Sequence, residues 1–247
     1  MEYKTSISKV TEDNVTVRGE KLSQLIKNWK FTDAVFLEIS GRKPTEEEST
    51  IFEKILISII DHGMGTTSSL TTRFAASGGN SLHVAVGAGV LSLGEYHGGA
   101  IEKAMEQFYS WNKKNPEEIA KIVEEMLTKK ETLYGFGHKI YKNEDPRVTF
   151  IIEEMKKCSF KSSFLHMKEI VETKFKELKG KILPLNIDGL MAMILCDFAF
   201  PPHLGKGVFI IGRVPSLVAQ AFEELTSEKP VRRLDEAEIK YLPDVQK

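Results

Sequence analysis

Apolar residues along most of this chain recur three or four positions apart, which is the spacing of one face of an α-helix. The runs IFEKILISII at residues 51–60 and TFIIEEMKK at residues 149–157 are two examples. Strand patterns are confined to the N-terminus, where residues 4–10 (KTSISKV) and 14–19 (NVTVRG) alternate β-branched with polar residues. The pattern predicts an all-α fold preceded by short N-terminal β strands that form a small hairpin or ladder.

Helix starts are marked by residues whose side chains satisfy backbone groups at helix ends. Thr45, followed by glutamates as far as Glu48, has the pattern of a capping box. Asn115 precedes Pro116, and Asp145 precedes a proline in the same way, which is the arrangement favoured at the first turn of a helix. We therefore predict helices that begin directly after these three capping residues.

One predicted helix, at residues 81–94 (SLHVAVGAGVLSLG), is rich in small residues, among them Gly87 and Gly89. A glycine within a helix costs about 1 kcal/mol relative to alanine, so a compensating contact is expected. Small residues let another helix approach closely, which predicts a tight helix crossing. The pattern does not distinguish a crossing within the chain from one with the same helix of a second subunit.

Composition narrows the class of protein. The 247 residues, 41% of them hydrophobic, suffice for one large domain or for one domain with a smaller insert. A net charge of −1 with interspersed signs indicates neither nucleic acid nor a membrane as partner. The start lacks a secretory signal, and the longest apolar stretch, residues 189–202, is too short to span a bilayer. Cys158 and Cys196 are best interpreted as reduced thiols, so we expect a soluble cytoplasmic protein.

Three of the six histidines lie in glycine-flanked joints between helical runs: His62 in DHG, His97 in EYHGGA and His138 in GFGHK. Glycine beside a polar residue lets backbone and ligand approach closely, and loops between rigid helices often hold reactive groups. Each histidine taken singly is more often structural than catalytic. Three histidines in the same kind of setting favour a functional site.

Several common kinds of site are disfavoured by the spacing of these residues. The chain has no HExxH and no histidine pair at helical spacing, which disfavours a metal site. GFGHKI lacks the third glycine of GxGxxG, and GxxxxGK and GxSxG are absent. No local pattern therefore supports a nucleotide loop or a serine nucleophile.

Asp188, in LNIDGL, lies at the start of an almost wholly apolar helix. It could simply be the helix N-cap, or its carboxylate could be made more basic by the apolar surroundings and carry a proton. Arg147 and Arg213 each stand at one end of an apolar run, as end-caps or as anion anchors. Three loop histidines, one aspartate and two arginines together suit a carboxylate-rich substrate at which a proton moves on carbon next to a carbonyl.

These residues also stand in motifs that resemble those of the citrate synthase superfamily. GFGHKIYKNEDPR at residues 135–147 resembles the GFGH-x-x-Y-x-x-x-DPR motif, and EYHGGAIE resembles LHGGA-x-E. The expected order along the chain also holds for four further motifs: the N-terminal VRGEKLSQLI, DHG, NIDGL and IIGR. The resemblance extends from about residue 15 to near the C-terminus.

The resemblance implies an all-helical, dimeric enzyme of two domains that handles acetyl-CoA and oxaloacetate. The large domain would comprise residues 1–98 and 201–247, and the small domain, closing over the substrates, residues 99–200. No tightly bound cofactor is implied, since the coenzyme A thioester is a substrate.

The resemblance also implies roles for single residues. His97 would hydrogen-bond the thioester oxygen of the acetyl-CoA enol, Asp188 would move the proton at its methyl carbon, and His138 would face the oxaloacetate carbonyl. Its carboxylates would be bound by His62, Arg147 and Arg213, and by an arginine from a second subunit, Arg233 or Arg232. Coenzyme A would lie against the loop with Gly135, Gly137, Lys139 and Lys142.

Departures from citrate synthase point to one branch of the superfamily. The chain is much shorter, and DHG and N-x-DGL resemble the citryl-CoA lyase group, including the C-terminal module of ATP-citrate lyase. The resemblance then implies cleavage of citryl-CoA to acetyl-CoA and oxaloacetate, a carbon–carbon lyase reaction. In that direction His138 would take the hydroxyl proton, directly or through water, and Asp188 would return a proton to carbon.

Two alternatives stay open from the sequence: a short citrate or methylcitrate synthase, and a non-catalytic paralogue that binds coenzyme A esters. A homodimer or a higher homo-oligomer is expected. The chain contains no module for activating citrate with ATP, which leaves open whether a separate citryl-CoA synthetase supplies its substrate.

Overall fold

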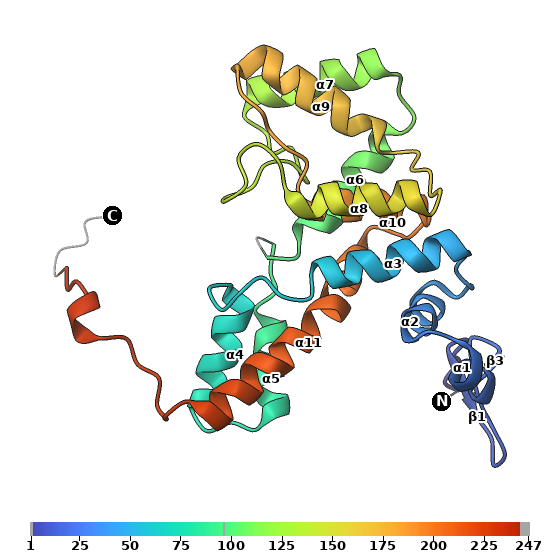
Figure 1. The fold of residues 1–247 in the computed structure, drawn as a ribbon, viewed down its shortest axis with the longest axis vertical. Helices are drawn as coiled ribbons and strands as arrows, with labels where there is room; N and C mark the ends of the chain where they lie inside the picture. The colour runs from blue at the N-terminus through green and yellow to red at the C-terminus, as the bar shows by residue number, and fades with distance from the viewer. Residues whose placement is uncertain (1, 96, 243–247) are drawn as a thin grey trace. The chain divides into compact units, whose positions relative to one another are not determined.

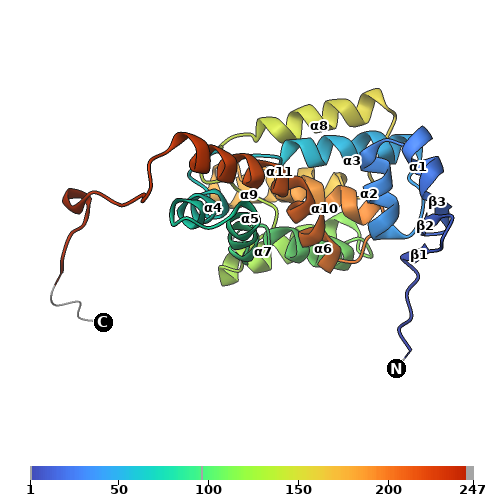
Figure 2. The same ribbon diagram turned by 90° about the horizontal axis from the view of Figure 1, so that it is seen from below.

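A computed structural model describes residues 2–95 and 97–242 of the chain (Figures 1 and 2). Its N-terminal part contains a three-stranded antiparallel sheet in the order β1-β2-β3. Ser8 pairs with Val17, and Val17 pairs on its other side with Glu20. The strands are β1 (Ser8–Val10), β2 (Val15–Val17) and β3 (Glu20–Lys21). The N-terminal strands predicted from the alternation of residues are confirmed.

Helices account for most of the remaining described residues, which confirms the all-α prediction. None of them combines the length and the apolar character needed to cross a membrane. In chain order they are α1 (Leu22–Asn28), α2 (Phe31–Ser40), α3 (Glu46–Ser58), α4 (Thr67–Ser77), α5 (Leu82–Leu91), α6 (Ala100–Trp111), α7 (Pro116–Lys129), α8 (Pro146–Lys157), α9 (His166–Lys179), α10 (Ile187–Asp197), α11 (His203–Ser227) and the short 3₁₀ helix η1 (Glu236–Glu238).

The three predicted helix starts are confirmed by their capping hydrogen bonds. Thr45 and Glu48 form a full capping box at the start of α3, in which each side chain bonds the other residue's backbone N–H. Asn115 caps α7 with a second capping box. Asp145 caps α8 by accepting from the backbone N–H of Arg147. These local contacts satisfy amides that have no partner within the helix.

Contacts among the described residues divide the chain into two compact units. Unit 1 comprises the residues up to Ile59 together with Gly98–Gly212, and unit 2 comprises Ile60–His97 with the residues from Arg213 onward. The cut after His97 lies one residue from a predicted domain boundary, whereas the N-terminal residues group with the segment that follows Gly98. The predicted large and small domains stay a prediction.

Helix α10 forms the apolar centre of unit 1. It packs along α6, while α3 lies beside α8 and α7 beside α9 (Figures 1 and 2). Its residues from Gly189 to Cys196 are all buried, and full burial of a large apolar side chain contributes roughly 1.5–3 kcal/mol. Cys196 and Cys158 are both free thiols, as predicted. A helix held so firmly fixes the position of its first turn, which carries Asp188.

Unit 2 contains the helix rich in small residues, α5, which packs against α4. A methyl group added at Gly89 would lie 3.1 Å from the carbonyl oxygen of Ser68 and 3.2 Å from Leu217, so α5 needs glycine there. This is the crossing within the chain that the sequence allowed. Around Gly87 the described chain leaves open space, and a crossing with a second subunit stays a prediction.

Candidate active site

The loop that carries His138 belongs to unit 1 and runs beside the segment that leads into α10. The backbone N–H of Gly137 donates to the carbonyl of Pro184 at 2.7 Å, and that of Asn186 donates to the carbonyl of Gly135 at 3.0 Å. Gly135 has a φ of +84°, and a Cβ there would lie 2.6 Å from the Cα of Gly189. Glycine is therefore required for the loop to lie this close to α10.

His138 has a defined orientation on this loop. Its Nδ1 accepts the backbone N–H groups of Ile140 and Tyr141, both at 3.1 Å, and its ring stacks on that of Tyr141 at 4.6 Å between centroids. A neutral imidazole that accepts at Nδ1 carries its hydrogen on Nε2. In this tautomer Nε2 is a donor, and the proton-accepting role expected for His138 in cleavage stays a prediction.

The two lysines predicted to contact coenzyme A lie on the same loop and are both exposed. The ammonium group of Lys142 donates to the carbonyl oxygen of His138 at 3.1 Å, so this lysine closes the loop on itself. Lys139 lies one residue beyond His138 on the solvent side. Their contact with a coenzyme A phosphate stays a prediction.

Arg147 lies in the first turn of α8, next to His138. One of its terminal nitrogens is 3.5 Å from Nε2 of His138, which is a contact and not a hydrogen bond when Nε2 carries the ring hydrogen. Its guanidinium donates to both carboxylate oxygens of Asp145, from Nε at 2.9 Å and from a terminal nitrogen at 2.7 Å. The side chain of Asp145 is fully buried, while that of Arg147 keeps 20% of its surface exposed. Asp145 can therefore hold the guanidinium of Arg147 in place while Arg147 still presents an N–H group to a ligand.

Asp188 occupies the second position of α10 and is half-buried. The N-cap of this helix is Asn186, whose side-chain oxygen accepts the backbone N–H of Gly189 at 2.9 Å. The interpretation of Asp188 as the helix N-cap is therefore wrong. Asn186 stands just before the helix, two residues ahead of Asp188, and its side chain reaches the otherwise unpaired amide of Gly189. The amide nitrogen of Asn186 also donates to the carbonyl of Gly137 at 2.7 Å, which ties the His138 loop to the helix start.

A second group of candidate residues lies in unit 2, around His97. Nε2 of His97 is 2.8 Å from the hydroxyl oxygen of Ser68, a buried residue on α4. Burial lowers the pKa of His97 below its ordinary value, and the positive charges of Arg213 and His62 lower that pKa further. His97 is therefore neutral at neutral pH, and the three predicted residues share one neighbourhood.

The two other members of this group differ in exposure. His62 is exposed on a loop shaped by Asp61, whose carboxylate accepts the backbone N–H groups of His62 and Gly63 at 2.6 and 2.9 Å. Arg213, on α11, is only 3% exposed. A buried arginine and an exposed histidine beside a neutral one form a setting that favours an anionic ligand.

The two C-terminal arginines are placed differently in unit 2. Arg232 donates twice to the buried carboxylate of Glu224, at 2.8 and 2.7 Å, and that carboxylate also pairs with Arg73. Arg233 is exposed, with a surface carboxylate of Glu236 at 3.5 Å. The structure therefore leaves Arg233 as the more accessible of the two, and its predicted contact with a second subunit stays a prediction.

Sequence reasoning missed two residues that hold predicted site residues. The sequence identifies Asp145 only as a helix start, although DPR places it two residues before Arg147. Ser68 lies in the run TTSSL, where no spacing distinguishes it from its neighbours. The described residues contain no group of three or more His, Cys, Asp or Glu side chains arranged to hold a metal ion.

Comparisons with known proteins place this geometry in a family. Residues 34–234 match the family described as "Citrate synthase, C-terminal domain". The citrate synthase of Heyndrickxia coagulans is 31% identical over 213 residues, which are 84% of this chain and 56% of that protein. The chain spans about half the length of the first curated relatives it matches, at 56%, 49% and 52%.

Solved structures extend the likeness. The citryl-CoA lyase of Hydrogenobacter thermophilus is 40% identical, with a TM-score of 0.92 over 99% of this chain and 96% of that one. The citrate synthase of Thermoplasma acidophilum, solved with carboxymethyl coenzyme A and oxaloacetate, is 26% identical with a TM-score of 0.70 over 87% of this chain and 59% of that one. Together with the motifs around His97, His138 and Asp188, these matches show that the chain belongs to the citrate synthase family and resembles a stand-alone citryl-CoA lyase over nearly its whole length.

Proposed function

We propose that this protein is a citryl-CoA lyase, which cleaves citryl-CoA to acetyl-CoA and oxaloacetate. The observation that carries the proposal is the 40% identity with the Hydrogenobacter thermophilus lyase over 96% of that chain. The curated citrate synthases match over only about half of their length. The motifs DHG and N-x-DGL point to the same branch.

Cleavage requires that the hydroxyl of citryl-CoA lose its proton, since the electron pair of the O–H bond becomes the new carbonyl bond. The carbon–carbon bond then breaks and its electron pair forms the enolate of acetyl-CoA. A proton added to the enolate carbon completes the methyl group. One proton leaves oxygen and one reaches carbon, so a single base that first accepts and then donates balances the reaction.

Among the proposed residues of unit 1, Asp188 is the group suited to carry this proton. His138 has its hydrogen on Nε2, because Nδ1 accepts two backbone amides, and we assign it to donate to the substrate oxygen. A carboxylate has no such restriction and can take the hydroxyl proton, directly or through water, and return it to carbon. Arg147 would bind a carboxylate of the oxaloacetate part of the substrate.

The residues of unit 2 suit the other product. When Ser68 donates to Nε2, the neutral ring of His97 carries its hydrogen on Nδ1, where it can hydrogen-bond the enolate oxygen. A neutral donor serves here because its low pKa prevents premature protonation of the enolate. Arg213 and His62 would bind substrate carboxylates, and Arg233 would do so from a second subunit of a homodimer. Coenzyme A would lie against the Gly135–Gly137 loop, with Lys139 and Lys142 near its phosphates.

A coupled assay tests the proposal. Purified protein is given synthetic citryl-CoA, with malate dehydrogenase and NADH reporting oxaloacetate, and a parallel reaction of acetyl-CoA with oxaloacetate reports free thiol. The proposal expects rapid loss of NADH and little thiol release, with the loss of NADH abolished in Asp188→Asn. Robust thiol release would instead identify a synthase, and silence in both reactions with retained coenzyme A ester binding would identify a non-catalytic paralogue.

A further inference from the structure

Four backbone N–H groups along residues 185–189 hold the segment that leads into α10. They donate to two carboxylates, one loop carbonyl and one capping side chain. The donors and acceptors are Leu185 N–H to Glu172 at 2.9 Å, Asn186 N–H to Gly135 at 3.0 Å, Ile187 N–H to Asp145 at 3.1 Å and Gly189 N–H to Asn186 at 2.9 Å. Asp188 sits within this run, so its position depends on these contacts.

Asp145 differs from the other acceptors because it serves two parts of the site at once. One oxygen accepts from Nε and from the backbone N–H of Arg147, and the other accepts from a terminal nitrogen of Arg147 and from the backbone N–H of Ile187. The carboxylate is fully buried. Burial raises the pKa of Asp145, but the bonds from Arg147 and Ile187 outweigh it and hold that pKa below its ordinary value.

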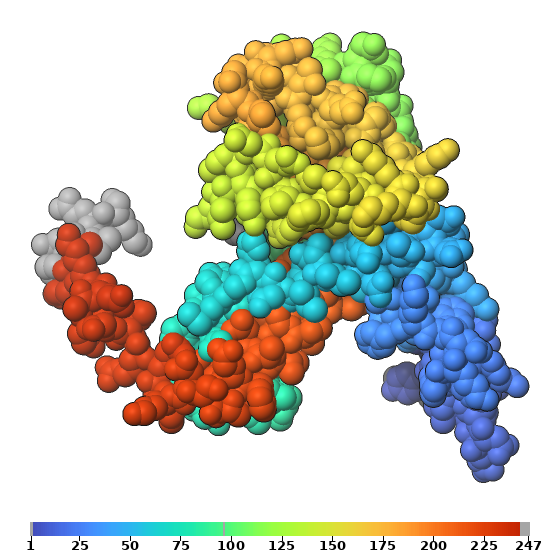
Figure 3. All heavy atoms as spheres, in the orientation of Figure 1, coloured from blue at the N-terminus to red at the C-terminus, as the bar shows by residue number. Residues whose placement is uncertain are grey.

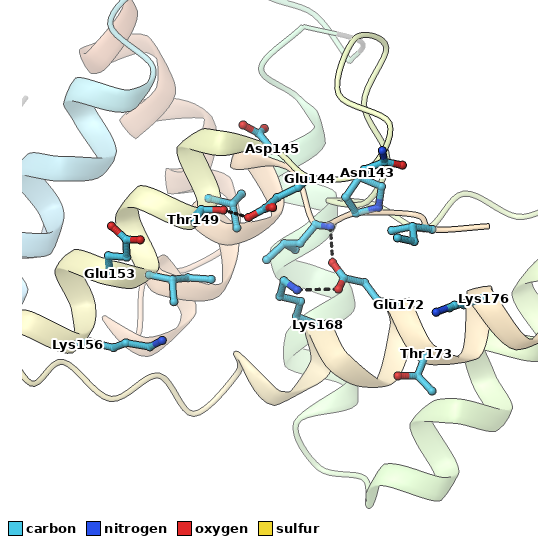
Figure 4. Close-up of a pocket in the computed structure, with 15 residues that line it drawn as sticks. Asn143, Glu144, Asp145, Thr149, Glu153, Lys156, Lys168, Glu172, Thr173 and Lys176 are labelled. Atoms are coloured by element: carbon cyan, nitrogen blue, oxygen red, sulfur yellow. Dashed lines mark hydrogen bonds and ion pairs between the residues drawn. The ribbon is translucent and has the colours of Figure 1, made fainter.

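Glu172 offers an internal comparison. It lies on α9 and lines, with Asp145 and Leu185, a pocket of about 540 Å³ between α8 and α9. Figure 4 shows its two oxygens joined to Lys168 and to the segment before α10. In the space-filling view, α8 and α9 adjoin on the face towards the viewer (Figure 3). Glu172 therefore holds the same segment as Asp145 but has no contact with Arg147.

We propose that Asp145 is a positioning residue that couples substrate anchoring to proton transfer, by holding Arg147 and the turn that carries Asp188 with one carboxylate. The proposal rests on the proposed function of these two residues. Four donors converge on two oxygens, and an amide in place of the carboxylate has only one oxygen. Asp145→Asn would turn an N–H₂ group towards a donor, so Arg147 loses an acceptor in either amide orientation and the Ile187 amide loses its acceptor in one of them.

The test is a double-mutant cycle of Asp145→Asn and Arg147→Ala, with Glu172→Gln as the matched control. Because a misplacement near 1 Å can cost about 100-fold in rate, we expect Asp145→Asn to lower kcat/KM about 100-fold, through both a higher KM and a lower kcat. In the Arg147→Ala background the effect on KM should vanish, while a loss of about 10-fold in kcat through Ile187 and Asp188 persists. Glu172→Gln keeps an oxygen that can accept the Leu185 amide, so it should change neither parameter by more than about threefold.

Several outcomes would overturn the proposal. Unchanged kinetics in Asp145→Asn would do so, as would an equal loss in Glu172→Gln, since both would assign Asp145 a structural role at most. Strictly additive effects of Asp145→Asn and Arg147→Ala on KM would remove the coupling. Circular dichroism melting of each variant identifies any protein that is unfolded at the assay temperature, and Asp145→Glu, which keeps both oxygens, should recover part of the activity where the fold is retained.

Assays of the wild-type protein distinguish a failure of this proposal from a failure of the proposed function. If it condenses acetyl-CoA with oxaloacetate and does not cleave citryl-CoA, the lyase proposal fails and the same cycle is read from thiol release. If it does neither, calorimetric binding of oxaloacetate is the readout. Asp145→Asn should then weaken binding about 10-fold, and only when Arg147 is present. Unchanged binding in that variant would overturn the positioning role.

Discussion

The two groups of candidate residues place a histidine in opposite electrostatic surroundings. In unit 1, His138 lies beside Arg147, whose charge is balanced by a buried carboxylate that also holds the backbone. In unit 2, His97 has a hydroxyl partner, and burial together with the nearby positive charges of Arg213 and His62 lowers its pKa. The first arrangement fixes geometry through paired charges, whereas in the second burial and nearby positive charges keep one imidazole ring neutral. The same residue type therefore stands in two different electrostatic settings, and the two units should respond differently to mutation and to pH.

The largest effect is expected at Asp188, in the group that fixes geometry. Asp188→Asn removes the base that we assign to proton transfer, and general acid–base catalysis contributes about 10²- to 10⁴-fold, so kcat should fall by about 1,000-fold. The helix start should survive because Asn186 is its cap. Turnover of citryl-CoA and the melting temperature are the measurements. Near-normal turnover in a folded variant would remove Asp188 from the mechanism.

The next largest effect is expected for Arg147, the proposed anchor of a substrate carboxylate. Arg147→Ala should weaken the affinity for oxaloacetate by about 100-fold, because the charge-assisted hydrogen bond to the ligand is lost and the buried carboxylate of Asp145 keeps only the backbone amides of Ile187 and of residue 147 as donors. Calorimetric titration with oxaloacetate measures the loss. Arg42→Ala is a suitable control, since Arg42 forms a comparable bidentate pair with Glu48 far along the chain from both groups. An unchanged affinity in Arg147→Ala would refute the anion-anchor role.

A smaller effect is expected from the hydroxyl that holds His97. Ser68→Ala removes the hydrogen bond at 2.8 Å to Nε2, and loss of one orienting hydrogen bond should reduce kcat by about 10-fold. The neighbouring Ser69→Ala is the control, because Ser69 instead receives a hydrogen bond from Thr66. Equal losses in both variants would indicate a general disturbance of α4 and not a role for Ser68.

The smallest effect concerns stability and pH. The folded pKa of His97 lies below its ordinary value of 6.5, so the unfolded chain binds a proton first as pH falls. The contribution of His97 to the free energy of unfolding is therefore complete above pH 6.5 and is lost as pH falls through the folded pKa. The depressed pKa of Asp145 acts in the same direction but only below its ordinary value of 3.8.

Urea unfolding from pH 7.5 to pH 5 measures this difference between the groups. The slope of unfolding free energy against pH should become shallower in His97→Gln and stay unchanged in Asp145→Asn. A slope that changes in Asp145→Asn over this pH range, or that stays the same in His97→Gln, would contradict the expected difference between the two groups.

Much of the local structure and the choice of candidate residues could be predicted from the sequence. Helix starts at Thr45, Asn115 and Asp145 depend on side chains within three residues of the amides that they cap, so the pattern contains the whole interaction. The apolar periodicity similarly determines that the fold is helical. The motifs around His97, His138 and Asp188 could be recognised because their order along the chain is itself informative.

Other features could be decided only by tertiary structure, because they join residues that are distant in sequence. Asp145 reaches the amide of Ile187 across 42 positions, and Ser68 reaches His97 across 29. The tautomer of His138 depends on how its loop folds back to place two amides at Nδ1. A sequence thus determines which chemical groups are present and how helices begin, whereas packing of segments against one another determines which nitrogen carries a proton and which carboxylate holds which arginine.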